Sequence, residues 1–401
     1  MAKVCIIGFG CVGSGTYEVL KQNKQLIEMR TGETVDVKYI VDIRDFSGHE
    51  VEPFVTTNFD EVLSDEEVGI VIETMGGTTF AYNYTKAALE HGKNVVTSNK
   101  ELVALKGDEL FALAKAHGVN YFYEASVGGG IPIIRPLISS LGANRVTEIT
   151  GILNGTTNYI LTNMLKKGTS FEECLKEAQR LGYAESNPTA DVEGFDTGKK
   201  ISILSSMVLG KKVNYEHVYT EGISNVTSED AHYAEALGCA IKLIGKYRET
   251  DEGAEVFVAP MFVAKESPLY NIDDVFNGIL VYGDMLGEAL FYGRGAGMLA
   301  TASAVVSDVM EIVKNAPDHT LIPWQPCKDN IVKDYSKVKA CFFVRVKDNG
   351  GSMSKVISAL NGEKTLELYD GEFAVVTPCM TEEELTSLLN GVEIISKYMF
   401  V

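Results

Sequence analysis

A glycine motif near the N-terminus restricts what the first part of this chain can fold into. Residues 4–7 form a short apolar run, typical of a buried parallel strand, which leads into Gly8-Phe9-Gly10-Cys11-Val12-Gly13 and a helical stretch. In a G-x-G-x-x-G turn between strand and helix, the first glycine permits the tight turn. The second lets a pyrophosphate approach the backbone, and the third lets helix and strand pack closely. The motif predicts dinucleotide binding; the alternative is a glycine-rich turn without a ligand.

Strands and helices alternate through the first part of the chain. Strands are expected at 35–42, 68–73, 93–97 and 120–124, and helices at 81–91 and 108–117. Repeated βα units predict a doubly wound parallel sheet, in which ligands gather at the carboxyl ends of the strands. Thr74 follows one strand end, and Ser98 and Lys100 follow another, so we expect these side chains near the ligand.

Two residues at the end of the second strand bear on the choice of cofactor. An acid at this place binds the ribose hydroxyls of NAD, whereas an arginine accommodates the 2′-phosphate of NADP. The chain has both, as Asp42 and Arg44. Because Arg44 stands later, where the strand opens into the loop, we expect NADP, with NAD as the alternative.

The rest of the chain follows a different pattern. A strand at 145–153, helices at 159–165 and 171–181 and strands at 240–248, 255–264 and 278–282 indicate an α+β arrangement. After a linker at 315–326, the tail fits a β-α-β-β-α-β module of the ferredoxin-like type. The predicted fold class is α/β, with three domains. They are a Rossmann-type domain at 1–130, completed by about 294–320, an α+β domain at 131–293, and a linker with a small ferredoxin-like domain at 321–401.

Two glycine runs interrupt the later pattern. Residues 126–132 expose several backbone carbonyls, which suits a hinge or the ligation of a monovalent cation; from the residues alone a hinge is preferred. Residues 293–297 precede a helix expected at 301–313. This second run is either a helix N-terminus presented to a phosphate or a device for close packing, and the residues favour neither.

The stretch 183–200 is dense in carboxylates and ends in a lysine pair. Its first part is predicted to be a loop, and from about Asp196 the apolar spacing through residues 201–208 predicts a helix. On that helix Lys200 falls within the apolar arc, whereas Lys199 faces the serine side. A buried ammonium is costly unless it is paired or lines a cavity. Lys200 is therefore either half of an ordinary i,i+4 pair with Asp196 or a lysine lining a cleft.

The overall composition limits partners and location. A formal net charge of −19 argues against nucleic acid or an anionic membrane as a partner. The seven cysteines are scattered without a C-x-x-C, which predicts neither a zinc site nor a disulfide framework and indicates a reducing compartment. No signal peptide is visible, and no apolar run approaches the roughly 20 residues of a membrane span. We expect a cytoplasmic protein.

The lysines and carboxylates suggest the chemistry. A nicotinamide oxidoreductase needs a proton donor for the oxygen being reduced, and the six histidines lie in no motif. A lysine serves if burial or a second cation lowers its pKa, so Lys100 and Lys200 facing one carbonyl would suit. Carboxylates at Glu185, Asp191 and Asp196 would hold an ammonium. This set indicates an amino-acid substrate that carries a carbonyl or an alcohol.

Six motifs, in order and spread over essentially the whole chain, resemble those of homoserine dehydrogenase. They are the glycine turn, Val96-Thr97-Ser98-Asn99-Lys100, Tyr123-Glu124-Ala125-Ser126-Val127-Gly128-Gly129-Gly130-Ile131-Pro132, Gly151-Ile152-Leu153-Asn154-Gly155-Thr156-Thr157-Asn158-Tyr159, the stretch from Gly182-Tyr183-Ala184-Glu185 to Lys200, and Gly295-Ala296-Gly297 with Thr301-Ala302. The resemblance implies reversible NAD(P)H-dependent reduction of L-aspartate 4-semialdehyde to L-homoserine, in the biosynthesis of threonine, methionine and isoleucine.

The resemblance also implies roles for single residues. Lys200 is the expected proton donor and acceptor, with Lys100 and Asp196 assisting. The expected substrate contacts are Tyr183, Thr156, Lys100, Glu185, Asp191 and Asp196. The expected dinucleotide contacts are Gly8, Phe9, Gly10, Cys11, Val12, Gly13, Arg44, Thr74, Ser98, Lys100 and Gly297, with Arg44 at the 2′-phosphate. The expected ligands of a monovalent cation such as sodium, now preferred over a hinge, are the backbone carbonyls of Glu124, Val127, Gly129 and Ile131.

The tail resembles a regulatory domain of the ACT type, at which threonine inhibits some bacterial family members. Its usual Asp-x-Pro-Gly turn appears here as Asp348-Asn349-Gly350-Gly351, without proline, which puts threonine binding in question and leaves dimerisation as another role. The middle domain is expected to bind the substrate and to form a homodimer or homotetramer.

Two alternatives remain. An aspartate-semialdehyde-type dehydrogenase needs a nucleophilic cysteine with a base nearby, but Cys5 falls inside a buried strand and Cys11 inside the glycine turn. A non-enzymatic NAD(P)-binding amino-acid sensor would not need two lysines and three carboxylates together. A turnover assay separates the enzyme from the sensor.

Overall fold

The structure is a computed structural model that describes residues 1–315, 323–350, 352–362 and 364–401. The chain divides into two compact units. Unit 1 contains residues 1–144, 202–215 and 293–329, and unit 2 contains residues 145–201, 216–292 and 330–401. Each unit has its own main sheet and its own buried core.

Unit 1 is built on a parallel sheet with the strand order β3-β2-β1-β4-β5-β6. The sheet reverses direction of winding at β1, as in doubly wound dinucleotide-binding folds, so the predicted Rossmann-type fold is confirmed. β1 and β4 read as apolar runs because both faces of each strand are covered. The strands are β1 (Ala2–Ile7), β2 (Val35–Val41), β3 (Val55–Thr56), β4 (Val68–Glu73), β5 (Asn94–Thr97) and β6 (Tyr121–Phe122).

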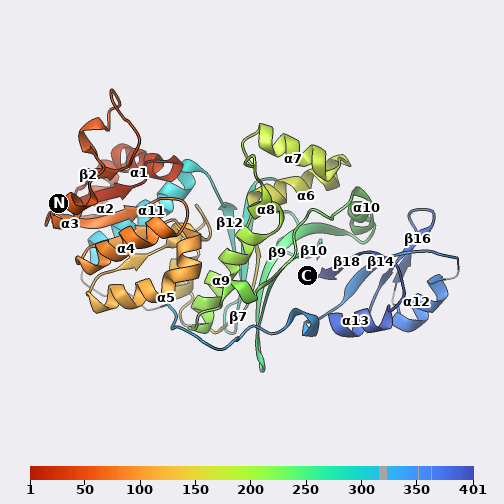
Figure 1. The fold of residues 1–401 in the computed structure, drawn as a ribbon. Helices are drawn as coiled ribbons and strands as arrows, with labels where there is room; N and C mark the ends of the chain where they lie inside the picture. Colours follow the sequence, from red (N-terminus) through yellow and green to blue (C-terminus); the bar gives the residue numbers. More distant parts are fainter. Residues whose placement is uncertain (316–322, 351, 363) are drawn as a thin grey trace. The chain divides into compact units, whose positions relative to one another are not determined.

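The helix α11 (Met298–Asn315) comes from far along the chain but belongs to unit 1. In Figure 1 its cyan ribbon lies among the red and orange N-terminal elements. Its apolar face, which includes Val305 and Val309, packs in the same buried cluster as Val4 and Ile6 of β1. The other helices of this unit are α1 (Cys11–Gln22), α2 (Lys24–Thr31), α3 (Phe59–Ser64), α4 (Thr79–Glu90) and α5 (Lys100–Ala116).

Unit 2 contains one large mixed sheet with the order β12-β11-β7-β9-β10-β18-β14-β16-β15, and β8 also pairs with β10. Its first part is β7 (Val146–Ile152), β8 (Tyr219–Thr220), β9 (Cys239–Thr250), β10 (Gly253–Ala264), β11 (Phe276–Gly283) and β12 (Gly287–Arg294). The predicted strands at 240–248, 255–264 and 278–282 are thus confirmed. The helices are α6 (Gly155–Lys167), α7 (Phe171–Arg180), α8 (Thr189–Val192), α9 (Phe195–Leu209) and α10 (Ser228–Ala236).

The tail has the predicted β-α-β-β-α-β order. It runs through β14 (Phe342–Lys347), α12 (Ser352–Leu360), β15 (Lys364–Leu366), β16 (Glu372–Val376), α13 (Glu382–Leu388) and β18 (Ile394–Phe400). Its last strand pairs in parallel with β10, through Met261 opposite Met399 and Phe262 opposite Phe400. The tail therefore continues the sheet of the middle of the chain.

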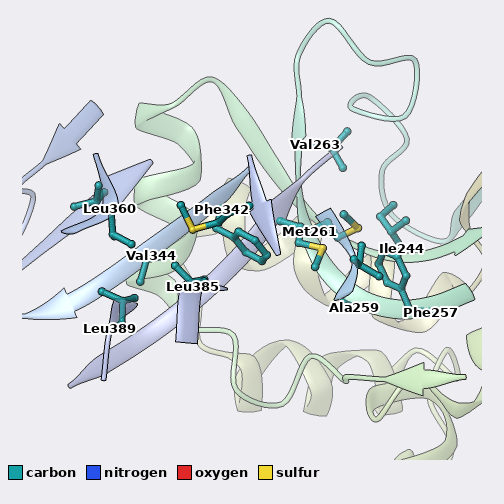
Figure 2. Packing of buried hydrophobic residues seen from close by; sticks show 14 of the residues in the cluster. Ile244, Phe257, Ala259, Met261, Val263, Phe342, Val344, Leu360, Leu385 and Leu389 are labelled. Atoms are coloured by element: carbon teal, nitrogen blue, oxygen red, sulfur yellow. The ribbon is translucent and has the colours of Figure 1, made fainter. Parts of the chain in front are cut away.

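Tail and middle strands also share one hydrophobic core. Figure 2 shows Ile244 and Phe257, from β9 and β10, and Phe342 and Val344, from β14, within this cluster. Leu360 of α12 closes it from the tail side. Burial of such side chains is worth about 1.5–3 kcal/mol each, which holds the tail on the middle strands.

The structure contains one disulfide, Cys341–Cys379, which the scattered cysteines of the sequence did not predict. The two residues flank the short antiparallel pair β13 (Lys339–Ala340) and β17 (Met380–Thr381), with Cα atoms 4.0 Å apart. They are separated by 38 positions, so no local spacing marks the pair in the sequence. The other five cysteines are free.

The predicted linker at 315–326 is partly outside the described residues, as are Pro317 and, in the tail turn, Gly351. Trp324, at the linker's end, is 2% exposed and packs edge-on against Phe111 with ring centroids 4.8 Å apart. That end of the segment thus belongs to a buried core instead of an exposed connection. Within the described ranges, none of the helices combines the length and apolarity that crossing a bilayer requires.

Candidate active site

The glycine turn leaves an open space beside the N-terminus of α1. Gly8 has a φ of +82°, and a Cβ at Gly13 would lie only 2.1 Å from the Gly8 carbonyl oxygen. Thr74, after β4, donates to that same oxygen at 2.6 Å. A Cβ at Gly10 would meet no atom within 4 Å, and Gly10 gives α1 no side-chain cap. An open helix N-terminus of this kind fits a pyrophosphate.

Asp42 and Arg44, the residues expected to select the cofactor, are bonded to each other. The Arg44 guanidinium donates from Nε at 3.0 Å and from Nη2 at 2.7 Å to the Asp42 carboxylate. The Phe9 backbone N–H, from the glycine turn, also donates to it at 2.7 Å. The guanidinium, together with the backbone donors, holds the pKa of the Asp42 carboxyl well below its usual range. Arg44 remains 54% exposed, so its free edge is open to an anion.

Glu73, a buried carboxyl that the sequence pattern did not single out, joins the loops after β4 and β5. It accepts from the Met75 N–H at 2.7 Å and from the Thr97 hydroxyl at 2.5 Å. The Asn99 amide links the same loops by donating to the Gly77 carbonyl at 2.7 Å. Burial raises the pKa of Glu73 to about 7.

Lys100 is the first residue of α5, because the side chain of Asn99 caps this helix by accepting from the Leu102 N–H at 3.0 Å. The predicted start near residue 108 is wrong, since the cap sets the helix start before the apolar spacing becomes visible. Lys100 and Ser98 are both half-buried at the carboxyl end of β5.

The two glycine runs pack on each other. The Gly130 N–H donates to the Arg294 carbonyl at 3.1 Å. A Cβ at Gly129 would come within 2.2 Å of the Gly295 carbonyl oxygen. The first run therefore needs glycine at residue 129, because the backbone of the second run approaches it closely, and this contact favours the packing interpretation of the second run. Gly297, with a φ of +121°, follows directly and precedes α11.

Three of the four carbonyls expected to hold a cation lie in the first of these runs, and the fourth, of Glu124, lies two residues before it. A Cβ at Gly128 would fall 2.2 Å from the Ile131 carbonyl oxygen. Any larger residue at this position would therefore displace that oxygen. Glu124 uses its carboxylate elsewhere, accepting from the backbone N–H groups of residues 133–135 at 2.6, 2.9 and 2.7 Å. Backbone oxygens fit a monovalent cation. Among the described residues, no cluster of His, Cys, Asp and Glu is arranged to hold a metal ion.

Lys200 is 8% exposed on the buried side of α9, where the helical spacing puts it. Its ammonium donates to Asp196 Oδ2 at 2.7 Å and to the Leu153 carbonyl at 2.8 Å. Lys199, its neighbour, is half-buried. An ammonium has three N–H donors, so after these two bonds Lys200 keeps one donor for a substrate oxygen.

Asn154 connects two of the expected carboxylates. It belongs to the motif at residues 151–159, but no role in the site was predicted for it. Its amide donates to Asp191 Oδ1 at 2.7 Å and to Asp196 Oδ2 at 3.0 Å. It is also the N-cap of α6, accepting from the Thr157 N–H at 2.9 Å. The helix therefore starts at Gly155, earlier than the predicted residue 159. An Asn directly after a strand and before a helix is the N-cap signal that would have found it.

The remaining expected substrate contacts lie around the start of α6. The Thr156 hydroxyl donates to the Tyr183 carbonyl at 2.6 Å, and the Tyr183 ring meets Tyr159 edge-on at 5.1 Å. Glu185 is exposed on the loop that follows. Unit 2 thus brings Asn154, Asp191, Asp196 and Lys200 into one bonded group. Unit 1 carries Lys100 and the residues expected to hold the dinucleotide and the cation.

A doubly wound sheet with an open glycine turn, together with a buried lysine–carboxylate pair, defines an NAD(P)-dependent oxidoreductase. Residues 8–124 match the family model for the homoserine dehydrogenase NAD-binding domain, and residues 132–310 match the model for homoserine dehydrogenase. The chain belongs to the homoserine dehydrogenase family.

Relatives and solved structures are similar over most or all of the chain. Homoserine dehydrogenase from Neisseria gonorrhoeae is 37% identical, over 98% of this chain and 95% of its own. A crystal structure of homoserine dehydrogenase from Thiobacillus denitrificans has a TM-score of 0.93 at 35% identity, covering 100% of this chain and 98% of that one. A hyperthermophilic archaeal homoserine dehydrogenase in complex with NADPH has a TM-score of 0.65 at 27% identity, over 77% of this chain and 97% of that one.

Proposed function

We propose that this enzyme interconverts L-homoserine and L-aspartate 4-semialdehyde, with Lys200 moving the proton. The observation that carries the proposal is the buried Lys200 ammonium, held at 2.7 Å by Asp196 and at 2.8 Å by the Leu153 carbonyl. The bound nicotinamide supplies or takes the hydride. A side chain fixed by two acceptors, with one donor left, suits proton transfer to a substrate oxygen. Family membership disfavours the sensor alternative.

Asp196 and Leu153 have distinct tasks in this proposal. During reduction of the aldehyde, Lys200 gives a proton to the oxygen, and in the reverse direction it takes the proton from the hydroxyl. Asp196 stabilises the ammonium form by a charge-assisted bond. The Leu153 carbonyl fixes where the third N–H points. Lys100, at the start of α5, is proposed to assist at the same oxygen.

The substrate ammonium is proposed to bind carboxylates of unit 2. Asp191 is half-buried and Glu185 is exposed, and both belong to the acidic stretch that leads to α9. Thr156 and Tyr183, bonded to each other, would line the same place. A cationic amino group matches this negative charge.

NADP is the proposed cofactor, because Arg44 presents a guanidinium fixed at 2.7 Å by Asp42 and still 54% exposed. A planar guanidinium binds phosphate in two-pronged fashion. The same contacts occupy Asp42, the residue that would otherwise bind the ribose of NAD. The relative in complex with NADPH supports this choice.

A monovalent cation such as sodium is proposed at the backbone carbonyls of Glu124, Val127, Gly129 and Ile131. Gly128 supports the site, since any Cβ there would strike the Ile131 carbonyl oxygen at 2.2 Å. The cation would stabilise the first glycine run, residues 126–132, which contacts the second run. Replacing sodium and potassium with choline in the assay, at constant ionic strength, tests whether activity depends on it.

A homodimer or homotetramer is proposed from the edge strand β12, whose side chains Leu290 and Tyr292 are 41% and 54% exposed. Threonine binding at the tail is a further proposal, supported by its β-α-β-β-α-β order and put in question by the altered turn at Asp348. A cytoplasmic location is also proposed.

Steady-state oxidation of L-homoserine tests the proposed reaction, with NADP and NAD side by side and threonine titrated in. Turnover with NADP preferred is the expected result. Absence of turnover with either cofactor, on folded protein with sodium present, would contradict the proposed substrate and leave the fold unaffected. Threonine inhibition would assign the tail a regulatory role.

A further inference from the structure

We propose that Asn154 is a positioning residue that ties the proton-transfer lysine to the carboxylate facing the substrate amino group. The inference rests on the proposed roles of Lys200 and Asp191. Asn154 is 6% exposed and lies between β7 and α6. It touches neither the reacting oxygen nor the cofactor in this account, and acts through Asp191 and Asp196.

The orientation of the Asn154 amide follows from its neighbours. Its Oδ1 accepts from the Thr157 N–H at 2.9 Å and from the Thr157 hydroxyl at 3.1 Å. Its Nδ2 faces Asp191 Oδ1 at 2.7 Å and Asp196 Oδ2 at 3.0 Å. The opposite orientation would set an amide oxygen against two carboxylates and an amide nitrogen against a donor. Only the observed orientation satisfies all four groups.

The neutral amide of Asn154 thus binds two negatively charged carboxylates at once. Asp191 comes from α8 and Asp196 from α9, and each accepts one proton of the same NH₂. Loss of the two N–H donors removes the group that links these like charges, so their mutual repulsion is less well compensated. Asn154 donates to both carboxylates, and the Lys200 ammonium donates to one of them, Asp196.

Two consecutive residues, Leu153 and Asn154, contact the Lys200–Asp196 pair. Leu153 accepts from the Lys200 ammonium through its carbonyl at 2.8 Å. Asn154, next in the chain, donates to the very oxygen of Asp196 that Lys200 bonds at 2.7 Å. Displacement of Asn154 therefore alters the Asp196–Lys200 pair and the Asp191 carboxylate together.

The test uses Asn154→Ser and Asn154→Asp, which both keep an N-cap oxygen for α6 but lose the NH₂ donors. We expect kcat for homoserine oxidation to fall about 10- to 100-fold, and KM for homoserine to rise by a similar factor, as for a lost bond to a charged group. Asn154→Asp adds negative charge beside Lys200, so the rising limb of its kcat–pH profile should move to higher pH. NADPH binding should not change.

Asn58 provides the control, because it is also a helix N-cap, at α3, where it accepts from the Asp60 N–H at 3.1 Å. Asn58→Ser and Asn58→Asp should leave kcat, KM and the pH profile as in the wild type. Wild-type kinetics in both Asn154 variants would overturn the inference. A lowered Tm with an unshifted profile would assign Asn154 to helix stability alone and would overturn it too.

Failure of this inference is distinguishable from failure of the proposed function. If Lys200→Ala loses turnover while the Asn154 variants keep a wild-type profile, only the role of Asn154 is wrong. If Lys200→Ala keeps turnover, the proposed proton transfer is wrong, and a kinetic effect of Asn154 would have to act through substrate binding.

Discussion

Single side chains in this enzyme are held in place by specific partners, some near in the sequence and some far from it. Arg44 is held by Asp42, Glu73 by Thr97, and Lys200 by Leu153. In each case the partner fixes the direction in which the charged or titratable side chain points. Defined direction is what a binding or catalytic group needs, because rotamer freedom is then lost before the ligand arrives.

Arg44→Gln is expected to change cofactor preference. The variant loses the guanidinium proposed to meet the 2′-phosphate, so kcat/KM for NADP should fall about 10- to 100-fold, the range of a charged hydrogen bond. The value for NAD should change little. Parallel assays with both cofactors measure the ratio, with Arg30→Gln on α2 as the control. An unchanged NADP-to-NAD ratio would remove Arg44 from cofactor selection.

Glu73→Gln is expected to raise stability in a pH-dependent way. Burial raises the pKa of Glu73 to about 7, above its value in the unfolded chain, so the folded state binds this proton more tightly. The stability that the protonated form contributes is complete below the unfolded pKa and is lost as pH rises through 7. Glutamine cannot ionise, so the variant should gain up to about 3 kcal/mol over the wild type by pH 8.

Denaturant unfolding at pH 5 and pH 8 measures this difference between Glu73→Gln and the wild type. Glu28→Gln, at an exposed carboxylate on α2, is the control and should show no such trend. A difference between variant and wild type that is the same at both pH values would contradict the raised pKa.

At the scale of elements, the tail is attached to the middle of the chain by a buried ionic group. Arg345 of β14 donates to Asp230 of α10 at 3.1 Å and to Glu372 of β16 at 2.8 Å. Asp230 is 0% exposed and also accepts from the Tyr398 hydroxyl of β18 at 2.9 Å. Three strands of the tail thus meet α10, a helix from the middle of the chain, within unit 2.

Arg345→Met should destabilise unit 2 by about 3–5 kcal/mol, because it leaves two buried carboxylates without their cation. Lys347→Met is the matched control on the same strand. Its pair with Glu393 is 51% and 55% exposed, so a loss of at most about 1 kcal/mol is expected. Chemical denaturation of both variants gives the two values. Equal effects would mean that the buried group contributes no more than a surface pair.

Element starts show what local sequence could and could not supply. The order of strands and helices followed from apolar periodicity, because burial repeats along each element. The starts of α5 and α6 did not, because Asn99 and Asn154 set them through side-chain hydrogen bonds before the apolar repeat begins. The Cys341–Cys379 pair and the β10–β18 pairing join residues far apart, and no local pattern encodes them.

The same limit applies to the site. The Lys200–Asp196 pair was visible as i,i+4 spacing on one helix. The linking roles of Asn154 and Glu73 were not, because each joins loops that only the folded sheet brings together. The family resemblance supplied the reaction, which spacing alone left at the level of an amino-acid carbonyl or alcohol.

At the scale of the whole molecule, β12 ends the large sheet with apolar side chains exposed. Met285 and Leu286, in the turn before it, are 82% and 53% exposed. An apolar edge strand without cover is an association surface. We predict that Leu290→Lys lowers the oligomeric state. Size-exclusion chromatography with light scattering measures the mass of the variant. Met29→Lys, at a 75% exposed methionine on α2, should leave it unchanged. A wild-type elution mass for Leu290→Lys would contradict the assignment of β12.

The central claim is that Lys200 carries the proton. Turnover of Lys200→Ala with L-homoserine and NADP tests it most directly, next to Lys199→Ala on the same helix and with NADPH binding and Tm measured on both. We predict that kcat of Lys200→Ala falls about 100- to 10,000-fold while NADPH binding and folding persist, and that Lys199→Ala keeps its turnover. Near-normal kcat in folded Lys200→Ala would contradict the account.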